Sequence, residues 1–367
     1  MSSSSKPLPQ CHGSLQELAK GLKLEVPRRY VQEQREPTFV SNGSSPLPSL
    51  PVIDMNDLIK IVLGSDDHMD ELNNLRSVCH EWGIFQLVNH GVDKLLVEKM
   101  KEEMVKFFQA PEEEKMRYKL KEGEYEGYGQ TIIHDQDQKV DWADRFYMIT
   151  NPLHRRKSNL LPQFPQLLRD TFEDYLQELH RLAMTLFGLI GQAVDIDKQE
   201  MLDVFEDGMQ SVRMTYYPPC PQPDRVIGLT PHSDAAGITI LLQVNGIEGL
   251  QVKKDGIWIP VNFLPDAFVI NVGDVLEIMS NGVYHSIEHR ATVNATKERI
   301  SLAMFFNPKL EAVVGPAKSL LNNTGNPPLY KTLVMEQYLK EFFSNKLNGK
   351  TFIKKMEIEN GEACETG

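Results

Sequence analysis

Two histidines and an aspartate are the residues of this chain whose types and spacing best suit a chemical role. His232 and Asp234 stand two apart in the stretch GLTPHSDAAGITILLQ (228–243), beside an apolar, β-branched run that predicts a buried strand. Side chains two apart on an extended chain point to the same side. His289 comes much later, at the end of another predicted strand.

Two imidazoles and one carboxylate can occupy one face of an octahedral metal ion, which is the ligand set of non-haem Fe(II) oxygenases. Zinc accepts the same ligands, but a catalytic zinc site is usually tetrahedral with one open position. Three open positions would let an organic chelator and O₂ bind together. Arg299 and Ser301 stand two apart on a further predicted strand. They would suit a small dianion, because a guanidinium meets a carboxylate with two parallel hydrogen bonds.

The first half of the chain alternates predicted strands with longer helices. The run 166–193 gives the strongest helix prediction, because its apolar residues repeat at three and four and form one face. Helices are also predicted at 69–81 and 93–109, and strands at 48–55, 84–92 and 145–149.

From residue 211 the pattern changes to short strands separated by turn residues. The predicted strands are VRMTYY, ITILLQV, GLQVK, IWIPV, AFVINV, VLEIM, VYHSIEH and ISLAMFF. Asp255-Gly256 predicts a hairpin between GLQVKK and IWIPV, since glycine tolerates positive φ. A further helix is predicted around 328–347. We therefore expect a mixed α and β fold, with a double-stranded β-helix (jelly-roll, cupin-like) core braced by N-terminal helices and a C-terminal helix.

This pattern divides the chain into five regions. They are an irregular N-terminal extension (1–49), a helix-rich region (50–205), the jelly-roll core (206–312), a C-terminal helical segment (313–350) and a flexible tail (351–367).

Charge and composition argue against several classes of function. The net charge is −12 and there is no long basic run, so nucleic acid and anionic membranes are poor partners. No apolar run approaches the roughly 18–20 residues that span a bilayer. The N-terminus lacks the apolar core of a secretory signal, and the four cysteines form no CxxC pair. We expect a cytoplasmic protein with reduced thiols.

Several motifs together resemble the plant iron(II)/2-oxoglutarate-dependent dioxygenases, from about residue 20 to about 350. The chain looks most similar to the senescence-related and codeine O-demethylase-like branch, which is related to anthocyanidin synthase and flavonol synthase. The motifs are VPRRYV (26–31), LPVIDM (50–55), EWGIFQLVNHGV (81–92), FFQAPEEEK (107–115), DWADRFYM (141–148), MTYYPPCPQPD (214–224), HSD (232–234), GDVLEIMSNGVYHSIEHR (273–290) and RIS (299–301).

The resemblance implies a ligand set and a cosubstrate. The implied iron ligands are His232, Asp234 and His289. The residues implied to bind 2-oxoglutarate are Arg299, Ser301, Tyr217 and Thr215. Relatives often carry Asn at position 215 and Lys or Arg at position 285, where this chain has Thr215 and His285. The implied cofactors are Fe(II), 2-oxoglutarate and O₂, with ascorbate as reductant.

The implied activity is oxidation of a C–H bond of a plant specialised metabolite, an alkaloid or a phenolic, with release of succinate and CO₂. Hydroxylation, O-demethylation, desaturation and ring closure all remain open. So do an oxidase of the same fold that does not use 2-oxoglutarate, and a non-catalytic ligand-binding descendant. We expect a monomer acting on a small molecule. The expected substrate-pocket residues are Tyr128, Phe146, Arg213 and Phe305.

Overall fold

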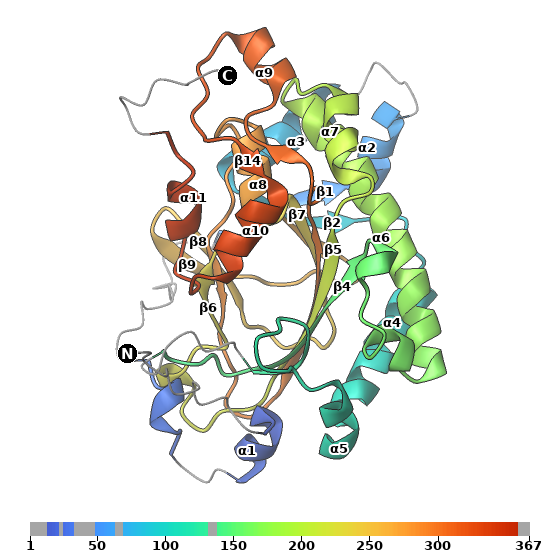
Figure 1. Ribbon diagram of the computed structural model, residues 1–367, viewed down its shortest axis with the longest axis vertical. Coiled ribbons are helices and arrows are strands. Elements are labelled where there is room, and N and C mark those ends of the chain that lie inside the picture. Colours follow the sequence, from blue (N-terminus) through green and yellow to red (C-terminus); the bar gives the residue numbers. More distant parts are fainter. Residues whose placement is uncertain (1–12, 22–24, 33–47, 63–68, 131–137, 359–367) are drawn as a thin grey trace, which may run out of the picture.

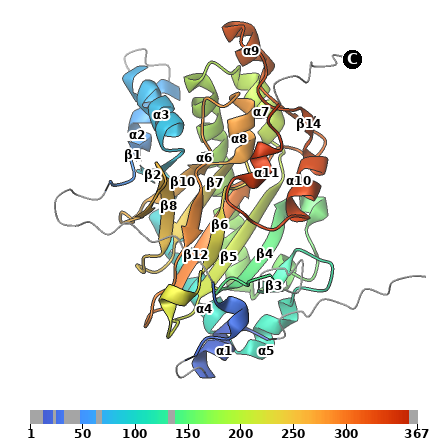
Figure 2. The same cartoon turned by 90° about the vertical axis from the view of Figure 1, so that its left-hand side faces the viewer.

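The computed structural model describes residues 13–21, 25–32, 48–62, 69–130 and 138–358. Two β-sheets face each other across the middle of the molecule, and helices cover the outer side of the larger sheet (Figures 1 and 2). This is the predicted double-stranded β-helix with its helical brace.

The larger sheet has eight strands and draws on both halves of the chain. In sheet order the strands are β1 (Val52–Asp54), β2 (Ile84–Val88), β10 (Phe268–Val272), β7 (Ile238–Gln243), β12 (Arg299–Phe306), β5 (Gln210–Tyr217), β4 (Asp144–Asn151) and β3 (Gly127–Gly129). Only β1 and β2 pair in parallel. Because β1–β4 come from the predicted helix-rich region, that region and the jelly-roll core share one sheet.

The smaller sheet has four strands and carries two of the three candidate metal ligands. Its order is β6 (Leu229–His232), β11 (His289–Ala291), β8 (Leu250–Lys254) and β9 (Ile257–Pro260). Asp255 and Gly256 join β8 to β9 with φ of 51° and 79°, which confirms the predicted hairpin. A third, two-stranded sheet pairs β13 (Val313–Val314) with β14 (Leu333–Val334).

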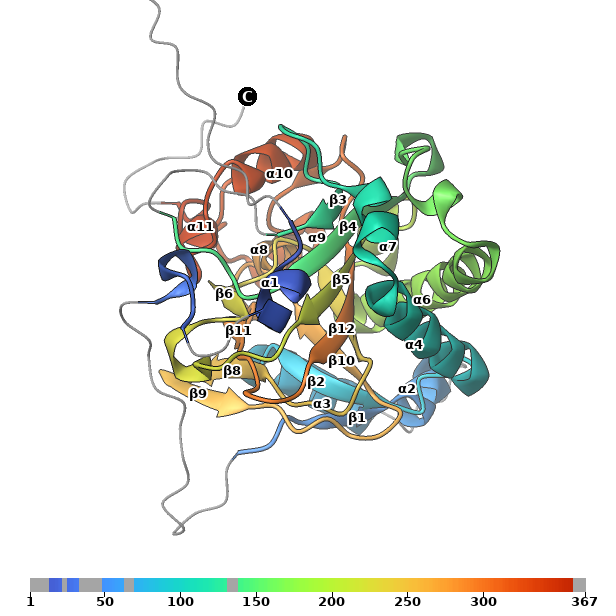
Figure 3. The same cartoon turned by 90° about the horizontal axis from the view of Figure 1, so that it is seen from below.

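The helices pack mainly on the outer face of the larger sheet and at its ends. They are α1 (Leu15–Gly21), α2 (Met55–Val62), α3 (Met69–Glu81), α4 (Lys94–Gln109), α5 (Glu112–Lys115), α6 (Gln166–Ala193), α7 (Lys198–Phe205), α8 (Asp274–Met279), α9 (Lys318–Thr324), α10 (Met335–Phe343) and α11 (Thr351–Lys354). The prediction of 166–193 as a helix is confirmed by α6, whose predicted apolar face is buried. Seen from below, α4 and α6 lie outside the ring of strands (Figure 3). None of the described helices is both long and apolar enough to cross a membrane.

Each strand of the larger sheet divides its side chains between two environments. The face toward α4 and α6 is apolar and belongs to the main core; on β12 it carries Ile300, Leu302, Met304 and Phe306. The opposite face, toward the smaller sheet, carries Arg299, Ser301, Ala303 and Phe305 of the same strand. The register aligns these four with Tyr217, Thr215, Arg213 and Ser211 of β5. Polar side chains from neighbouring strands therefore collect on the inner face.

Two predicted strands near the metal ligands are wrong. VLEIM lies in α8, and of VYHSIEH only His289 belongs to a strand, as the first residue of β11. All six residues of α8 are buried. Its sequence therefore lacks the alternation of apolar and polar residues that distinguishes a helix from a strand. The predicted C-terminal helix is also shorter, at Met335–Phe343. Residues 351–354, assigned to the tail, form α11, while 359–367 lie outside the described residues.

The two faces of β4 give a stability prediction. Phe146 is fully buried on the helix side, with ring centroids 5.7 Å from Phe107 and 5.2 Å from Phe164. We expect Phe146→Ala to lower the free energy of unfolding by about 3–5 kcal/mol, as measured by urea denaturation. Tyr147→Ala, on the other face of the strand, is the matched control and should cost less than half as much. Equal losses would contradict the assignment of faces.

Candidate active site

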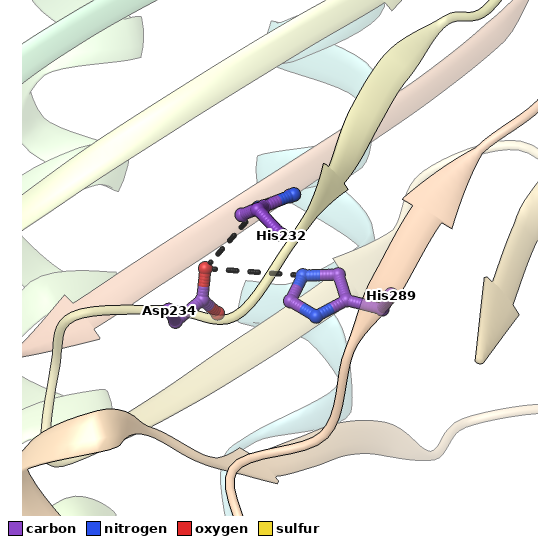
Figure 4. A group of neighbouring side chains, drawn as sticks. All are labelled: His232, Asp234 and His289. Atoms are coloured by element: carbon purple, nitrogen blue, oxygen red, sulfur yellow. Dashed lines mark ion pairs between the residues drawn. The ribbon is translucent and has the colours of Figure 1, made fainter. Parts of the chain in front are cut away.

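His232, Asp234 and His289 converge on one point between the two sheets (Figure 4). His232 ends β6 and His289 begins β11, and the two residues are paired across these strands. Asp234 lies in the turn after β6, with its Oδ1 atom 3.4 Å from Nε2 of His232 and 3.8 Å from Nε2 of His289. One ligand atom from each residue lies within 4.8 Å of the other two, so a single metal ion could contact all three.

Each imidazole is oriented by a backbone carbonyl. Nδ1 of His232 lies 2.8 Å from the Thr230 oxygen, and Nδ1 of His289 lies 3.1 Å from the Ile287 oxygen. A carbonyl only accepts hydrogen bonds, so in the neutral ring each Nδ1 carries the proton. The Nε2 lone pairs then face Asp234, as metal binding requires.

The carboxylate of Asp234 is fixed by two donors from the larger sheet. Its Oδ2 atom accepts hydrogen bonds from Thr239 Oγ1 at 2.7 Å and from Asn271 Nδ2 at 2.8 Å. Thr239 on β7 and Asn271 on β10 are register partners. These bonds leave Oδ1 free to face the histidines.

The electrostatics of the three groups favour metal binding at neutral pH. Burial lowers the pKa of His289 to about 4, with a further contribution from His232. Burial by itself would raise the pKa of Asp234, but the two histidines and Thr239 outweigh it and hold that pKa well below its usual range. A neutral imidazole and an ionised carboxylate are the forms that bind a metal. Two nitrogens and one oxygen on one side of a metal fit Fe(II) with three open positions.

A second polar site lies on the inner face of the larger sheet, around Arg299. This arginine is 2% exposed, and its guanidinium lies over the Tyr217 ring at 5.0 Å. Nη2 donates to Gln243 Oε1 at 2.9 Å, while Nε is buried without a hydrogen-bond partner in the described structure. Ser301 is the register partner of both Thr215 and Gln243. A buried guanidinium that forms no ion pair within the described residues fits a carboxylate ligand.

A cavity of about 410 Å³ opens beside the histidines and the aspartate. The larger sheet contributes Arg145, Tyr147, Ser211, Arg213 and Phe305 to its wall, and His232 and Asp234 lie at its base. The C-terminal segment contributes Leu339, Phe342, Phe343 and Leu347. The residues around Arg299 do not line this cavity, although Thr215 and Tyr217 follow Arg213 on the same face of β5.

Comparison with known proteins identifies this arrangement. Residues 208–308 match the family model of the 2OG-Fe(II) oxygenase superfamily, and residues 50–166 match that of the non-haem dioxygenase in morphine synthesis N-terminal region. The oxoglutarate-dependent flavonoid 7-O-demethylase 1 of Ocimum basilicum is 48% identical over 95% of this chain and 91% of its own length. The chain belongs to the 2OG-Fe(II) oxygenase superfamily.

Other relatives agree with this assignment. The codeine O-demethylase of Papaver somniferum is 46% identical over 94% of this chain and 96% of the relative. The crystal structure of JOX2 in complex with 2OG, Fe and JA superimposes with a TM-score of 0.83 at 33% identity, covering 96% of this chain and 99% of JOX2. The oxygenase is thus an Fe(II)- and 2-oxoglutarate-dependent oxidoreductase.

The four residues expected in the substrate pocket divide into two pairs. Arg213 and Phe305 line the cavity, whereas Tyr128 and Phe146 do not, so the prediction for Tyr128 and Phe146 is wrong. Tyr128 and Phe146 are register partners on the helix side of the sheet, buried in the main core. The antiparallel register aligns Phe146 with Met214 rather than with Arg213, so the alternation along β4 places Arg145 and Tyr147 in the cavity instead.

Sequence reasoning missed Thr239 and Asn271. Both are isolated polar residues in otherwise apolar strands, ITILL and AFVINV. A polar side chain in a buried strand needs a hydrogen-bond partner, which was a usable signal for a role beside the metal ligands. The aromatic residues of the C-terminal segment were also missed, because nothing in the local sequence reveals which cavity a distant helix will reach.

Buried acids connect the turn that carries Asp234 to the C-terminal segment. The backbone N–H of Asp274 donates to the Asp234 carbonyl at 2.7 Å, and Ser286 Oγ lies 2.6 Å from Asp274 Oδ1. The backbone N–H of Ser286 donates to Glu277 Oε2 at 2.6 Å, and the same oxygen pairs with Lys350 Nζ at 2.6 Å. Burial raises the pKa of Asp274 to about 7, although hydrogen bonds from Ser286 and Ser233 oppose the rise.

The donors to Asp234 give a prediction about metal affinity. We expect Thr239→Val and Asn271→Leu each to weaken Fe(II) binding by about 10–100-fold, because the carboxylate loses a bond that orients it. Anaerobic calorimetric titration with Fe(II) measures this without turnover. Thr239→Ser keeps the hydroxyl and should bind Fe(II) like the wild type. Wild-type affinity in Thr239→Val would contradict the orienting role.

The raised pKa of Asp274 predicts a pH-dependent stability. Between the unfolded value near 3.8 and the folded value of about 7, the folded protein holds a proton that the unfolded chain has lost. This contribution to stability is complete below pH 3.8 and declines as pH rises to about 7, by up to about 1.4 kcal/mol per pH unit. Asp274→Asn stays neutral, so its free energy of unfolding relative to the wild type should increase over this range and level off above it. Urea denaturation at several pH values measures the difference, and a constant difference would contradict the assignment.

Proposed function

We propose that this oxygenase uses Fe(II), 2-oxoglutarate and O₂ to remove an O-methyl group from a flat, methoxylated plant metabolite. The observation that carries the proposal is the His–Asp–His cluster beside a cavity of about 410 Å³, together with the buried Arg299, which forms no ion pair among the described residues. Three relatives at 46–48% identity are named as O-demethylases, which favours demethylation over simple hydroxylation.

The roles proposed for the residues follow from their positions. His232, Asp234 and His289 would hold the iron, and Arg299 with Ser301 would bind the distal carboxylate of 2-oxoglutarate, assisted by the hydroxyls of Tyr217 and Thr215. When bound, iron and cosubstrate supply an oxidant that converts a C–H bond into C–OH, with release of succinate and CO₂.

The protein contributes position and exclusion of water. Tyr147, Phe305, Phe342 and Phe343 offer aromatic walls for a flat substrate. These walls would hold one methyl group close to the metal, and the position of that group decides which bond is oxidised. Hydroxylation of an O-methyl carbon gives a hemiacetal, which breaks down to an alcohol and formaldehyde without needing a protein acid or base.

The oxygenase would act as a monomer in the cytoplasm on a small molecule, with ascorbate keeping the iron reduced. Its net charge of −12 supports a partner that is neither nucleic acid nor an anionic membrane. We also propose that the chain is organised in the five regions 1–49, 50–205, 206–312, 313–350 and 351–367.

Two substitutions test the proposed chemistry. Asp234→Ala should abolish succinate formation from 2-oxoglutarate, because the metal loses its carboxylate ligand. Arg299→Ala should raise the KM for 2-oxoglutarate by about 10–100-fold, the loss expected for a charged hydrogen bond worth 1.5–3 kcal/mol.

Succinate and formaldehyde are measured together during incubation with methoxylated phenolics and alkaloids. Formaldehyde formed in equal amount to the succinate supports demethylation, and succinate without formaldehyde supports hydroxylation. Substrate oxidation without succinate would instead identify an oxidase independent of 2-oxoglutarate. Succinate formation that persists in Asp234→Ala would overturn the metal assignment.

A further inference from the structure

Two neighbouring arginines, Arg145 and Arg213, lie in the wall of the cavity, which Arg299 does not line. Arg145 on β4 is the register partner of Thr215, and Arg213 on β5 is the register partner of Tyr147. Arg145 and Arg213 are therefore diagonal neighbours on the same face of an antiparallel pair, roughly 7–8 Å apart at the backbone. Both line the cavity that also contains His232 and Asp234.

Neither guanidinium forms an ion pair within the described parts of the chain. Arg213 has a buried Nε without a hydrogen-bond partner. Arg145 donates from Nε to the Gln130 carbonyl at 3.3 Å. Burial and the neighbouring charge of Arg213 lower the pKa of Arg145 to about 10, so Arg145 remains charged at neutral pH.

The acids that line the same cavity are hydrogen-bonded to other residues, although the charge of Asp141 also acts on Arg145. Asp234 is held by Thr239 and Asn271 and faces the histidines. Oδ1 of Asp141 accepts hydrogen bonds from the Thr230 backbone N–H at 3.0 Å and from its hydroxyl at 2.6 Å. Two adjacent positive charges in a partly buried wall repel each other, and an anion placed between them relieves that repulsion. An ammonium group at the same place would add a third positive charge.

We propose that Arg145 and Arg213 form an anion subsite that binds a carboxylate of the substrate. The inference rests on the proposed function and narrows it: the metabolite is a methoxylated carboxylic acid rather than an alkaloid cation. The carboxylate accepts hydrogen bonds from both guanidinium groups, and the aromatic part of the molecule extends along Tyr147 and Phe305 toward the metal ligands. Arg145 and Arg213 thereby select the substrate and fix its direction in the cavity.

Binding of three matched probes to the wild type tests the subsite without turnover. The probes are 4-methoxycinnamate, its neutral methyl ester and the cation 4-methoxyphenethylamine. Calorimetry is carried out under nitrogen with Fe(II) and saturating 2-oxoglutarate, so that the cosubstrate site is filled. We expect the acid to bind about 10–100-fold more tightly than the ester, and the amine to bind more weakly than the ester.

Variants then assign the preference to the two arginines. Arg145→Met and Arg213→Met keep much of the side-chain volume and should each lower the affinity for the acid by at least about 10-fold, with little change for the ester. Arg181→Gln, on an exposed position of α6, is the matched control and should keep the wild-type preference. Arg299→Ala should weaken 2-oxoglutarate binding yet retain the preference for the acid, which separates the two carboxylate sites.

Three results would overturn the subsite. They are equal affinity of the wild type for acid and ester, no binding of the acid up to its solubility limit, and an unchanged preference in both methionine variants. A preference for the acid that disappears only in Arg299→Ala would assign the carboxylate to the 2-oxoglutarate site. Succinate release without substrate tests the proposed function separately, because slow uncoupled turnover requires the metal and 2-oxoglutarate but neither Arg145 nor Arg213.

Discussion

The carboxylate of Asp234 is the point at which the two sheets of this oxygenase meet. One oxygen faces the histidines of the smaller sheet, and the other accepts hydrogen bonds from Thr239 and Asn271 of the larger sheet. Burying a carboxylate away from water costs free energy unless its oxygens are paired or hydrogen-bonded. Here each oxygen has partners on a different sheet, so the geometry of the metal site depends on how the two sheets are placed. The core around α6 therefore supports the metal site indirectly, because it packs against the larger sheet that carries Thr239 and Asn271.

The inner face of the larger sheet has an unusual balance of charge. Arg145, Arg213 and Arg299 all point to the interior, and none of them pairs with an acid among the described residues. The protein thus keeps positive charges that its own side chains do not neutralise. The distal carboxylate of 2-oxoglutarate at Arg299 and a substrate carboxylate between Arg145 and Arg213 would offset much of this positive charge.

Much of this organisation could be predicted from the sequence, because long periodic elements and sequence motifs can be recognised without knowledge of tertiary contacts. The α6 helix and the convergence of His232, Asp234 and His289 are examples. The helix α8 could not be distinguished from a strand, since burial on every side removes the periodicity. The prediction that Tyr128 and Phe146 line the pocket is wrong. The register among β3, β4 and β5 decides which residues share a face, and the local sequence does not reveal that register.

The C-terminal segment lines the cavity and also contacts the chain beside His232, although it lies more than 100 residues further along the sequence. Phe342, Phe343 and Leu347 contribute to the cavity wall, while the backbone N–H of Gly349 donates to the Pro231 carbonyl at 2.9 Å, immediately before His232. Lys350 pairs with buried Glu277, which also accepts from the backbone of Ser286. The segment is thus anchored at one end beside a metal ligand, and its apolar side chains reach the substrate from there. Substitutions among residues 342–347 can change the shape of the cavity while the anchor at 349–350 keeps the turn of Asp234 in place. A fold built this way could acquire new substrates without rebuilding its metal centre, since most residues that line the cavity and the three candidate metal ligands lie on different elements.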